Sequence, residues 1–272
     1  MPELVAEPAE GEKNELETGS MGLLQHLEEL RRRVLYSVVA VGVCFGAAWY
    51  KWDYLYDLMR RPIEQALANH HLPTELGYLN PTDPFNLSLK IGLLAGIFLA
   101  CPFLLYQVWM FISPGLYRRE KRFILPFLFL SVVLFLGGGY FGYRVVFPVA
   151  LDFLIKTGSD AGMKPLITIT EYTDLFLTIL LGLALIFELP IVLGFAGMMG
   201  VVNAKFLFKH IRGAVLVFFV FAAILTPTTD IMNMSIYALP MILLYILSIG
   251  IVYLVHPKQR RKRAEKRKAA GE

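Results

Sequence analysis

Six apolar runs dominate the chain, and they constrain its fold more than any other feature. They lie at about 34–50, 87–112, 123–147, 172–199, 212–226 and 231–255. A hydrocarbon core of about 30 Å takes about 20 apolar residues in a helix. Because a segment in contact with lipid must satisfy its own backbone hydrogen bonds, each run is predicted to be a helix. With 56% hydrophobic residues among 272, little of the chain remains for a soluble domain.

Lysine and arginine are distributed unequally among the connections between these runs. The connections assigned to one side, together with both tails, hold 19 of them, and the opposite side holds five. The positive-inside rule then predicts six spans with both termini in the cytoplasm. No module that binds DNA or RNA is recognisable, so nucleic acid is not expected as a partner.

The two tails differ in composition from the rest. Residues 1–20 carry six glutamates and few apolar residues, which predicts a disordered acidic tail. Residues 257–272 form a basic cytoplasmic tail, and 21–256 hold the six-helix transmembrane domain. We expect no second domain.

The last two spans and the outer loops have features of their own. Residues 213–225 reach only about 20 Å as a helix, and Pro240 interrupts the sixth run, so the fifth and sixth helices should be short, kinked or placed in a thinned bilayer. In the first outer loop, aromatic and apolar residues from Trp52 to Met59, followed by Pro62, predict a helix along the membrane surface. Residues 147–158 predict another short helix, and 166–172 an extended segment.

Motifs of enzyme chemistry are missing from the sequence. There is no HExxH, P-loop or GxSxG pattern, and the spans hold no grouping of Asp, His and Ser. His70 and His71 are adjacent but have no Cys or carboxylate at ligand spacing, so they are interpreted as loop residues. The sequence therefore predicts neither an enzyme nor a metal or cofactor site.

Two stretches place acids among cations. In "SPGLYRREKRF" (113–123), Glu120 lies among four cations, and the simplest interpretation is a hydrated residue in local ion pairs. In "HLEELRRRV" (26–34), Glu29 and Arg33 are spaced for an i, i+4 pair at the start of an amphipathic lead-in to the first span.

Two further acids lie in or beside the spans. Glu188 in "LIFELPIVLGF" lies deep in the fourth run, where an ionisable group is costly. It should face a cavity or a partner, or else be protonated and hydrogen-bonded between helices. Asp230 ends the turn "LTPTTD", where either Thr229 or Asp230 can cap the following helix.

Together these stretches resemble the TatC family of the twin-arginine protein translocase. The most specific match is "CPFLLYQVWMFISPGLYRREKR" (101–122), supported by "HLEELRRRV", "VVFPVALDFL" (145–154), "FELP" (187–190) and "LTPTTD" (225–230). The resemblance implies an all-α polytopic protein of the cytoplasmic (inner) membrane, with six helices in a concave cup and short fifth and sixth helices.

The resemblance also implies a function and its residues. Such a subunit binds the twin-arginine signal peptides of folded cargo, with Glu120 accepting the arginines and Phe111, Glu29 and Arg31 shaping the site. Glu188 and Asp230 would then serve contacts with the single-span subunits TatA and TatB, in a larger oligomer. Two alternatives remain from the residues alone: an ion-coupled transporter that uses Glu188 as its proton site, and a structural membrane scaffold.

Overall fold

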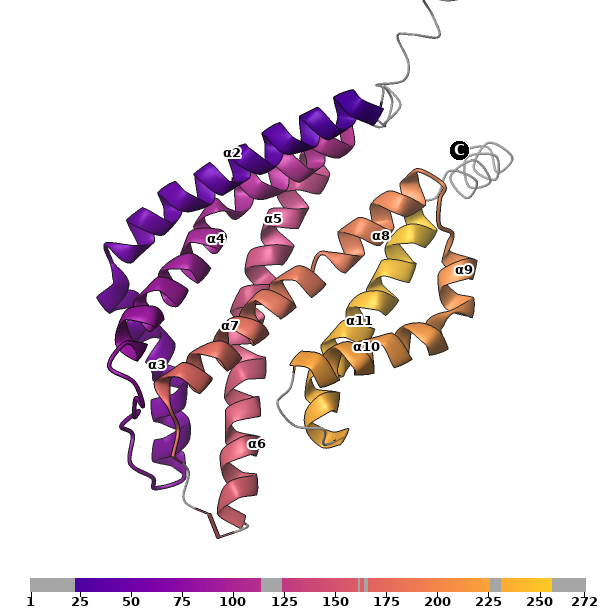
Figure 1. Ribbon diagram of the computed structural model, residues 1–272. Helices are drawn as coiled ribbons and strands as arrows, with labels where there is room; N and C mark the ends of the chain where they lie inside the picture. The colour runs from indigo at the N-terminus through magenta and orange to yellow at the C-terminus, as the bar shows by residue number, and fades with distance from the viewer. Residues whose placement is uncertain (1–22, 114–123, 161, 164–165, 226–230, 256–272) are drawn as a thin grey trace, which may run out of the picture.

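The computed structural model describes residues 23–113, 124–160, 162–163, 166–225 and 231–255. This part of the chain is almost entirely helical (Figure 1). The first half comprises α2 (Leu23–Trp49), α3 (Trp52–Asn69), α4 (Asp83–Ile112), α5 (Ile124–Phe141), a π-helical turn η3 (Gly142–Val146) and α6 (Phe147–Asp160). The second half comprises α7 (Ile169–Ile186), α8 (Leu189–Met198), α9 (Ala204–Lys209), α10 (Ile211–Leu225) and α11 (Ile231–Val255).

Helices α2 and α4 lie side by side along most of their length (Figure 1). Glycine permits their close approach, because a Cβ at Gly96 would lie 2.9 Å from the backbone of Phe45. One turn farther along α2, at its C-terminal end, Trp49 Nε1 donates to Ser88 Oγ at 3.3 Å. The amphipathic lead-in and the first apolar run thus form one continuous helix, whose register against α4 is fixed by a glycine.

Helix α3 passes through Pro62 without ending there. Proline has no N–H, so the carbonyl of Leu58, four residues earlier, loses its partner within the helix. The Tyr143 hydroxyl donates to that carbonyl at 2.8 Å, and the Tyr172 hydroxyl donates to the carbonyl of Met59 at 2.5 Å. A helix is therefore present in the predicted stretch, but it is longer than the motif suggested and packs its apolar face on protein; its position along the membrane surface stays a prediction.

The main core lies between α3, α6 and α7. Met59 and Ile63 pack there with Phe147, Tyr172 and Phe176. The third run and the helix predicted after it form one helical segment, Ile124–Asp160, joined through η3. In that turn the N–H of Phe147 bonds to the carbonyl of Gly142 instead of the residue four earlier, and the next residue is a proline.

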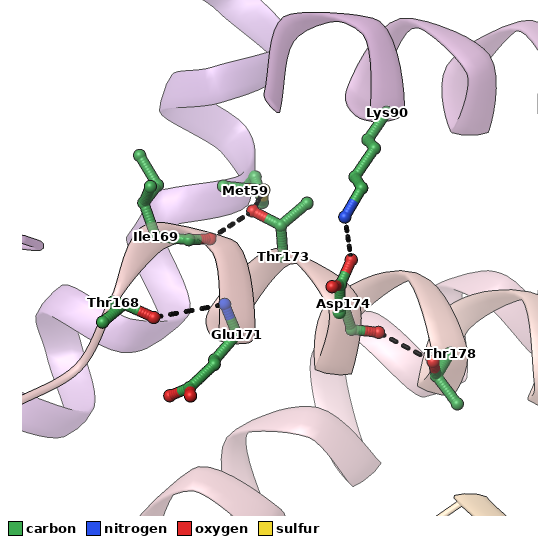
Figure 2. A network of polar contacts seen from close by, with 8 residues as sticks. All are labelled: Met59, Lys90, Thr168, Ile169, Glu171, Thr173, Asp174 and Thr178. Carbon is green, nitrogen blue, oxygen red and sulfur yellow. Dashed lines mark hydrogen bonds and ion pairs between the residues drawn. The ribbon is translucent and has the colours of Figure 1, made fainter. Parts of the chain in front are cut away.

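Polar contacts fix the start of α7 (Figure 2). Thr168, in extended conformation, accepts a hydrogen bond from the N–H of Glu171 and caps the helix. Thr173 donates to the carbonyl of Ile169 at 2.6 Å. The extended stretch expected here is brief, because Thr168 makes only an isolated bridge with Gly77 before the helix begins.

The fourth run is interrupted between α7 and α8, where Phe187 and Glu188 form a turn. Pro190 lies in the first turn of α8, where its missing N–H costs nothing because that donor has no partner within the helix. Glu188 is therefore the residue that precedes α8, and it lies at a break inside the span.

Of the last two helices, only α10 is short. It has 15 residues, about 22 Å at 1.5 Å per residue. The sequence predicts a short sixth helix as well, but α11 has 25 residues and continues through Pro240. Tyr237, Ala238 and Met241, on both sides of the proline, are fully buried, so packing holds α11 together across it.

The fold class predicted from the sequence is confirmed. Five helical segments of the described residues are long and apolar enough to cross a membrane, and α10 is a shorter apolar helix between the fourth and fifth of them. The protein is a multi-pass, all-α membrane protein with an arrangement consistent with six spans.

Candidate functional site

A hydrogen-bonded chain joins the start of α2 to the end of α4. Arg33 donates to Oε1 of Glu29 through Nε at 2.9 Å and also through Nη2, and its Nη1 donates to Oε1 of Gln107 at 3.2 Å. The side chains of Glu29 and Arg33 are only 11% and 15% exposed. The i, i+4 pair predicted from the sequence is therefore present, and it is anchored to α4 by Gln107.

The Glu29 carboxylate is only half satisfied. Its Oε2 atom is buried and has no hydrogen-bond partner among the described residues. A buried acceptor without a donor costs about 1–3 kcal/mol. This oxygen is therefore suited to receive a donor from a ligand.

An aromatic contact lies beside this chain. The rings of His26 and Phe111 stack with centroids 4.3 Å apart and an interplanar angle of 14°. Gln25, Arg31 and Leu35 line a cleft of about 420 Å³ together with Glu28 and Glu29. The fold thus brings together three residues that the resemblance named, Phe111, Glu29 and Arg31, at the adjoining ends of α2 and α4.

The other expected residues are not all visible. Glu120 and Asp230 lie outside the described residues, so their roles stay predictions. The sequence interpretation missed Gln107, an amide inside the apolar stretch "LLYQVWMF". A lone amide in a membrane span was a usable signal, because such a group needs a partner there.

Glu188 lies at the break between α7 and α8 and faces α4 and α5. Its carboxyl group interacts with Ser131 of α5 and is close enough to Cys101 of α4 for an electrostatic interaction. Ser131 also accepts a hydrogen bond from Trp109 Nε1 at 3.3 Å. Oε1 of Glu188 is buried without a partner among the described residues. The acid is thus held in place on one side and keeps one oxygen available.

An interhelical ion pair joins α4 to α7. Lys90 contacts Asp174, and Figure 2 shows the lysine reaching across from α4 to the carboxylate. Their side chains are 38% and 54% exposed. Lys90 lies seven residues into α4, about 10 Å along the helix. Because so open an ion pair is favourable only near water or lipid headgroups, we expect this end of the bundle to lie close to the membrane surface.

Comparison with known proteins identifies the family. The sequence model described as "Sec-independent protein translocase protein (TatC)" matches residues 25–240. The chain belongs to the TatC family. It is 57% identical over 249 residues to the TatC protein of Koribacter versatilis, covering 92% of this chain and 91% of that one. It is 34% identical to TatC of Aquifex aeolicus, covering 88% and 98%.

Solved structures agree with this assignment. A structure titled "Crystal Structure of Twin Arginine Translocase Receptor- TatC" superposes with a TM-score of 0.75 at 34% identity and covers 85% of this chain and 99% of that one. A second structure of TatC, in DDM, also has a TM-score of 0.75, at 35% identity. As a TatC-family protein, the chain is a subunit of the Sec-independent twin-arginine translocase and serves protein transport.

Proposed function

We propose that this TatC-family chain is the receptor for twin-arginine signal peptides and binds them where the start of α2 adjoins the end of α4. The observation that carries the proposal is the Glu29 carboxylate, of which one oxygen is fixed by Arg33 and the other is buried without a donor among the described residues. A guanidinium group supplies the donor geometry that such a carboxylate lacks. Folded cargo would be recruited through its signal peptide alone.

The same site favours arginine over lysine. Arginine presents a planar fork that can bond a carboxylate twice, whereas lysine offers a compact point charge. Arg31 and Arg32 both line the cleft. Their positive charges repel weakly basic peptides unless the peptide bonds directly to a carboxylate. Glu120, which follows α4 in the sequence, is proposed as the second acceptor, and Phe111 as an aromatic wall.

The intramembrane acid has a separate role in the proposal. Glu188 keeps a buried oxygen at the break between α7 and α8 for which the described residues supply no partner, and this suits a polar group on a partner helix. We assign this position, together with Asp230, to contacts with the single-span subunits TatA and TatB. The chain would lie in the inner membrane with both termini in the cytoplasm, as the charge asymmetry predicts.

Binding of a twin-arginine peptide and its twin-lysine control to the purified full chain tests the receptor role. Glu29→Gln and Glu120→Gln should each weaken binding of the arginine peptide by roughly 10- to 150-fold, the value of a hydrogen bond to a charged group. The preference for arginine over lysine should shrink in parallel.

Glu28→Gln is the matched control. Glu28 lines the same cleft but is exposed, so its carboxylate stays hydrated and its replacement should cost only a few-fold, about the value of a surface ion pair. If Glu28→Gln cost as much as Glu29→Gln, or if Glu29→Gln and Glu120→Gln kept the full arginine preference, the receptor site would be wrongly placed.

A further inference from the structure

We propose that the cleft between α9 and α11 binds one anionic phospholipid from the membrane leaflet on that side. The cleft has a volume of about 500 Å³ and combines an apolar lining with two lysines. A phospholipid offers the matching chemistry, an acyl chain attached to a phosphate. This site lies apart from the proposed signal-peptide site, so the two proposals stand or fall separately.

The apolar part of the cleft comes from the way α9 is held against α11. Leu207 of α9 is buried, and its carbonyl accepts a hydrogen bond from Tyr245 of α11 at 3.0 Å. Farther along α11, Ile249 and Gly250 line the cleft, with Phe208 on the α9 side. A Cβ at Gly250 would meet nothing within 4 Å, so the floor of the cleft is open there.

The cationic part comes from α9 itself. Lys205 and Lys209 are four residues apart and therefore on one face of the helix, and both line the cleft and are exposed. No ion pair to either is found among the described residues, and no Asp or Glu occurs in the sequence from 189 to 229. Their apolar stems can cover the cleft while the ammonium groups reach a phosphate at its rim.

The exposed aromatic residues of α9 favour a lipid over a soluble anion as the ligand. Phe206 and Phe208 are 52% and 67% exposed on the same short helix that carries the lysines. Exposed aromatic residues beside lysines are typical of a helix that lies at the boundary between headgroups and acyl chains. Basic pockets between spans on the cytoplasmic side bind anionic headgroups in this way, and the charge asymmetry predicts that α9 lies on that side.

Native mass spectrometry of the purified full chain, titrated with phosphatidylglycerol or with phosphatidylethanolamine of the same chains, tests the site. Phosphatidylglycerol should bind more tightly. Replacing both Lys205 and Lys209 with Gln should weaken it about 30-fold, since each lysine near an anionic lipid contributes about fivefold. Replacing Lys51 and Lys156, two exposed lysines predicted on the opposite side, with Gln removes the same charge and should change nothing.

A second pair of variants tests the apolar part while keeping both lysines. Gly250→Phe should fill the floor of the cleft and reduce binding of both lipids. Gly46→Phe is the control, because a Cβ added at that exposed glycine of α2 would also meet nothing within 4 Å, and Gly46 lines no part of the cleft. Equal affinity for the two lipids, or equal losses in the variants and their controls, would overturn the proposal.

Discussion

The hydrogen-bonded chain through Arg33 makes a quantitative prediction about residues that never touch the ligand. Gln107 accepts from Arg33 at 3.2 Å, and Arg33 in turn fixes one oxygen of Glu29. Gln107→Leu removes the acceptor and leaves an N–H of the partly buried Arg33 guanidinium without its partner. Hydrogen bonds to charged groups contribute about 1.5–3 kcal/mol, and the length of this one places it at the lower end. We therefore expect about a tenfold loss in affinity for a twin-arginine peptide.

A double-mutant cycle separates this positioning role from a general loss of stability. Glu29→Gln and Gln107→Leu act through the same arginine, so their effects should be coupled by about 1 kcal/mol, within the range of residues that share a partner. Gln107→Leu should therefore cost much less when Glu29 is already Gln. Binding of the labelled peptide to detergent-solubilised protein gives all four corners.

The control is a second double-mutant cycle, in which Glu28→Gln takes the place of Glu29→Gln. Arg33 donates to Glu29 and Gln107, whereas Glu28 is exposed at the cleft, so Glu28→Gln and Gln107→Leu should be additive within about 0.5 kcal/mol. Additivity in the Glu29 cycle, or equal coupling in both cycles, would show that Gln107 does not act through Arg33 on Glu29.

Three further tests, each with a matched control variant, concern the fold and the site at Glu188. Tyr143→Phe removes the donor to the carbonyl left open by the proline in α3 and should lower the free energy of unfolding by about 1–3 kcal/mol, whereas Tyr140→Phe, at an exposed tyrosine, should lower it little; equal losses would contradict the role of the hydroxyl. Gly96→Ala should lower the free energy of unfolding by about 1–3 kcal/mol, because the added methyl group overpacks α2 against α4. Gly137→Ala, where a Cβ meets nothing within 4 Å, should not lower it measurably. Glu188→Ala should reduce co-purification of single-span subunits more than Glu188→Gln, which keeps hydrogen-bonding capacity; normal amounts with both would make the acid structural.

Much of the fold follows from local sequence patterns. Apolar runs predicted the spans because a helix is the only structure that a single lipid-facing segment can adopt. The pair of Glu29 and Arg33 was predictable because residues four apart share a helix face. The break at Glu188 was not predicted, although Pro190 is a local signal for one, since it frees a carbonyl one turn earlier.

Contacts between helices could not be predicted in the same way. Gln107 meets Arg33 only because the close approach at Gly96 fixes the register of α2 on α4, and nothing near Gln107 in the sequence records this. The passage of α3 through Pro62 likewise depends on Tyr143, 81 residues later. A proline marks the end of a helix locally, but a hydroxyl from another helix can replace the missing interaction.

The sites proposed at Glu29 and at Glu188 share one property, a buried carboxylate oxygen without a hydrogen-bond partner. Among the described residues, three buried side-chain polar atoms lack a hydrogen-bond partner: Oε2 of Glu29, Oε1 of Glu188 and the hydroxyl of Tyr237. Lys90, by contrast, is neutralised within the chain by Asp174. An unsatisfied buried acceptor costs about 1–3 kcal/mol, so a chain selected for stability alone would have filled both carboxylates. Each acid instead has one interaction that fixes it and one oxygen that is open, which is the arrangement required to bind a donor from another molecule without rebuilding the site.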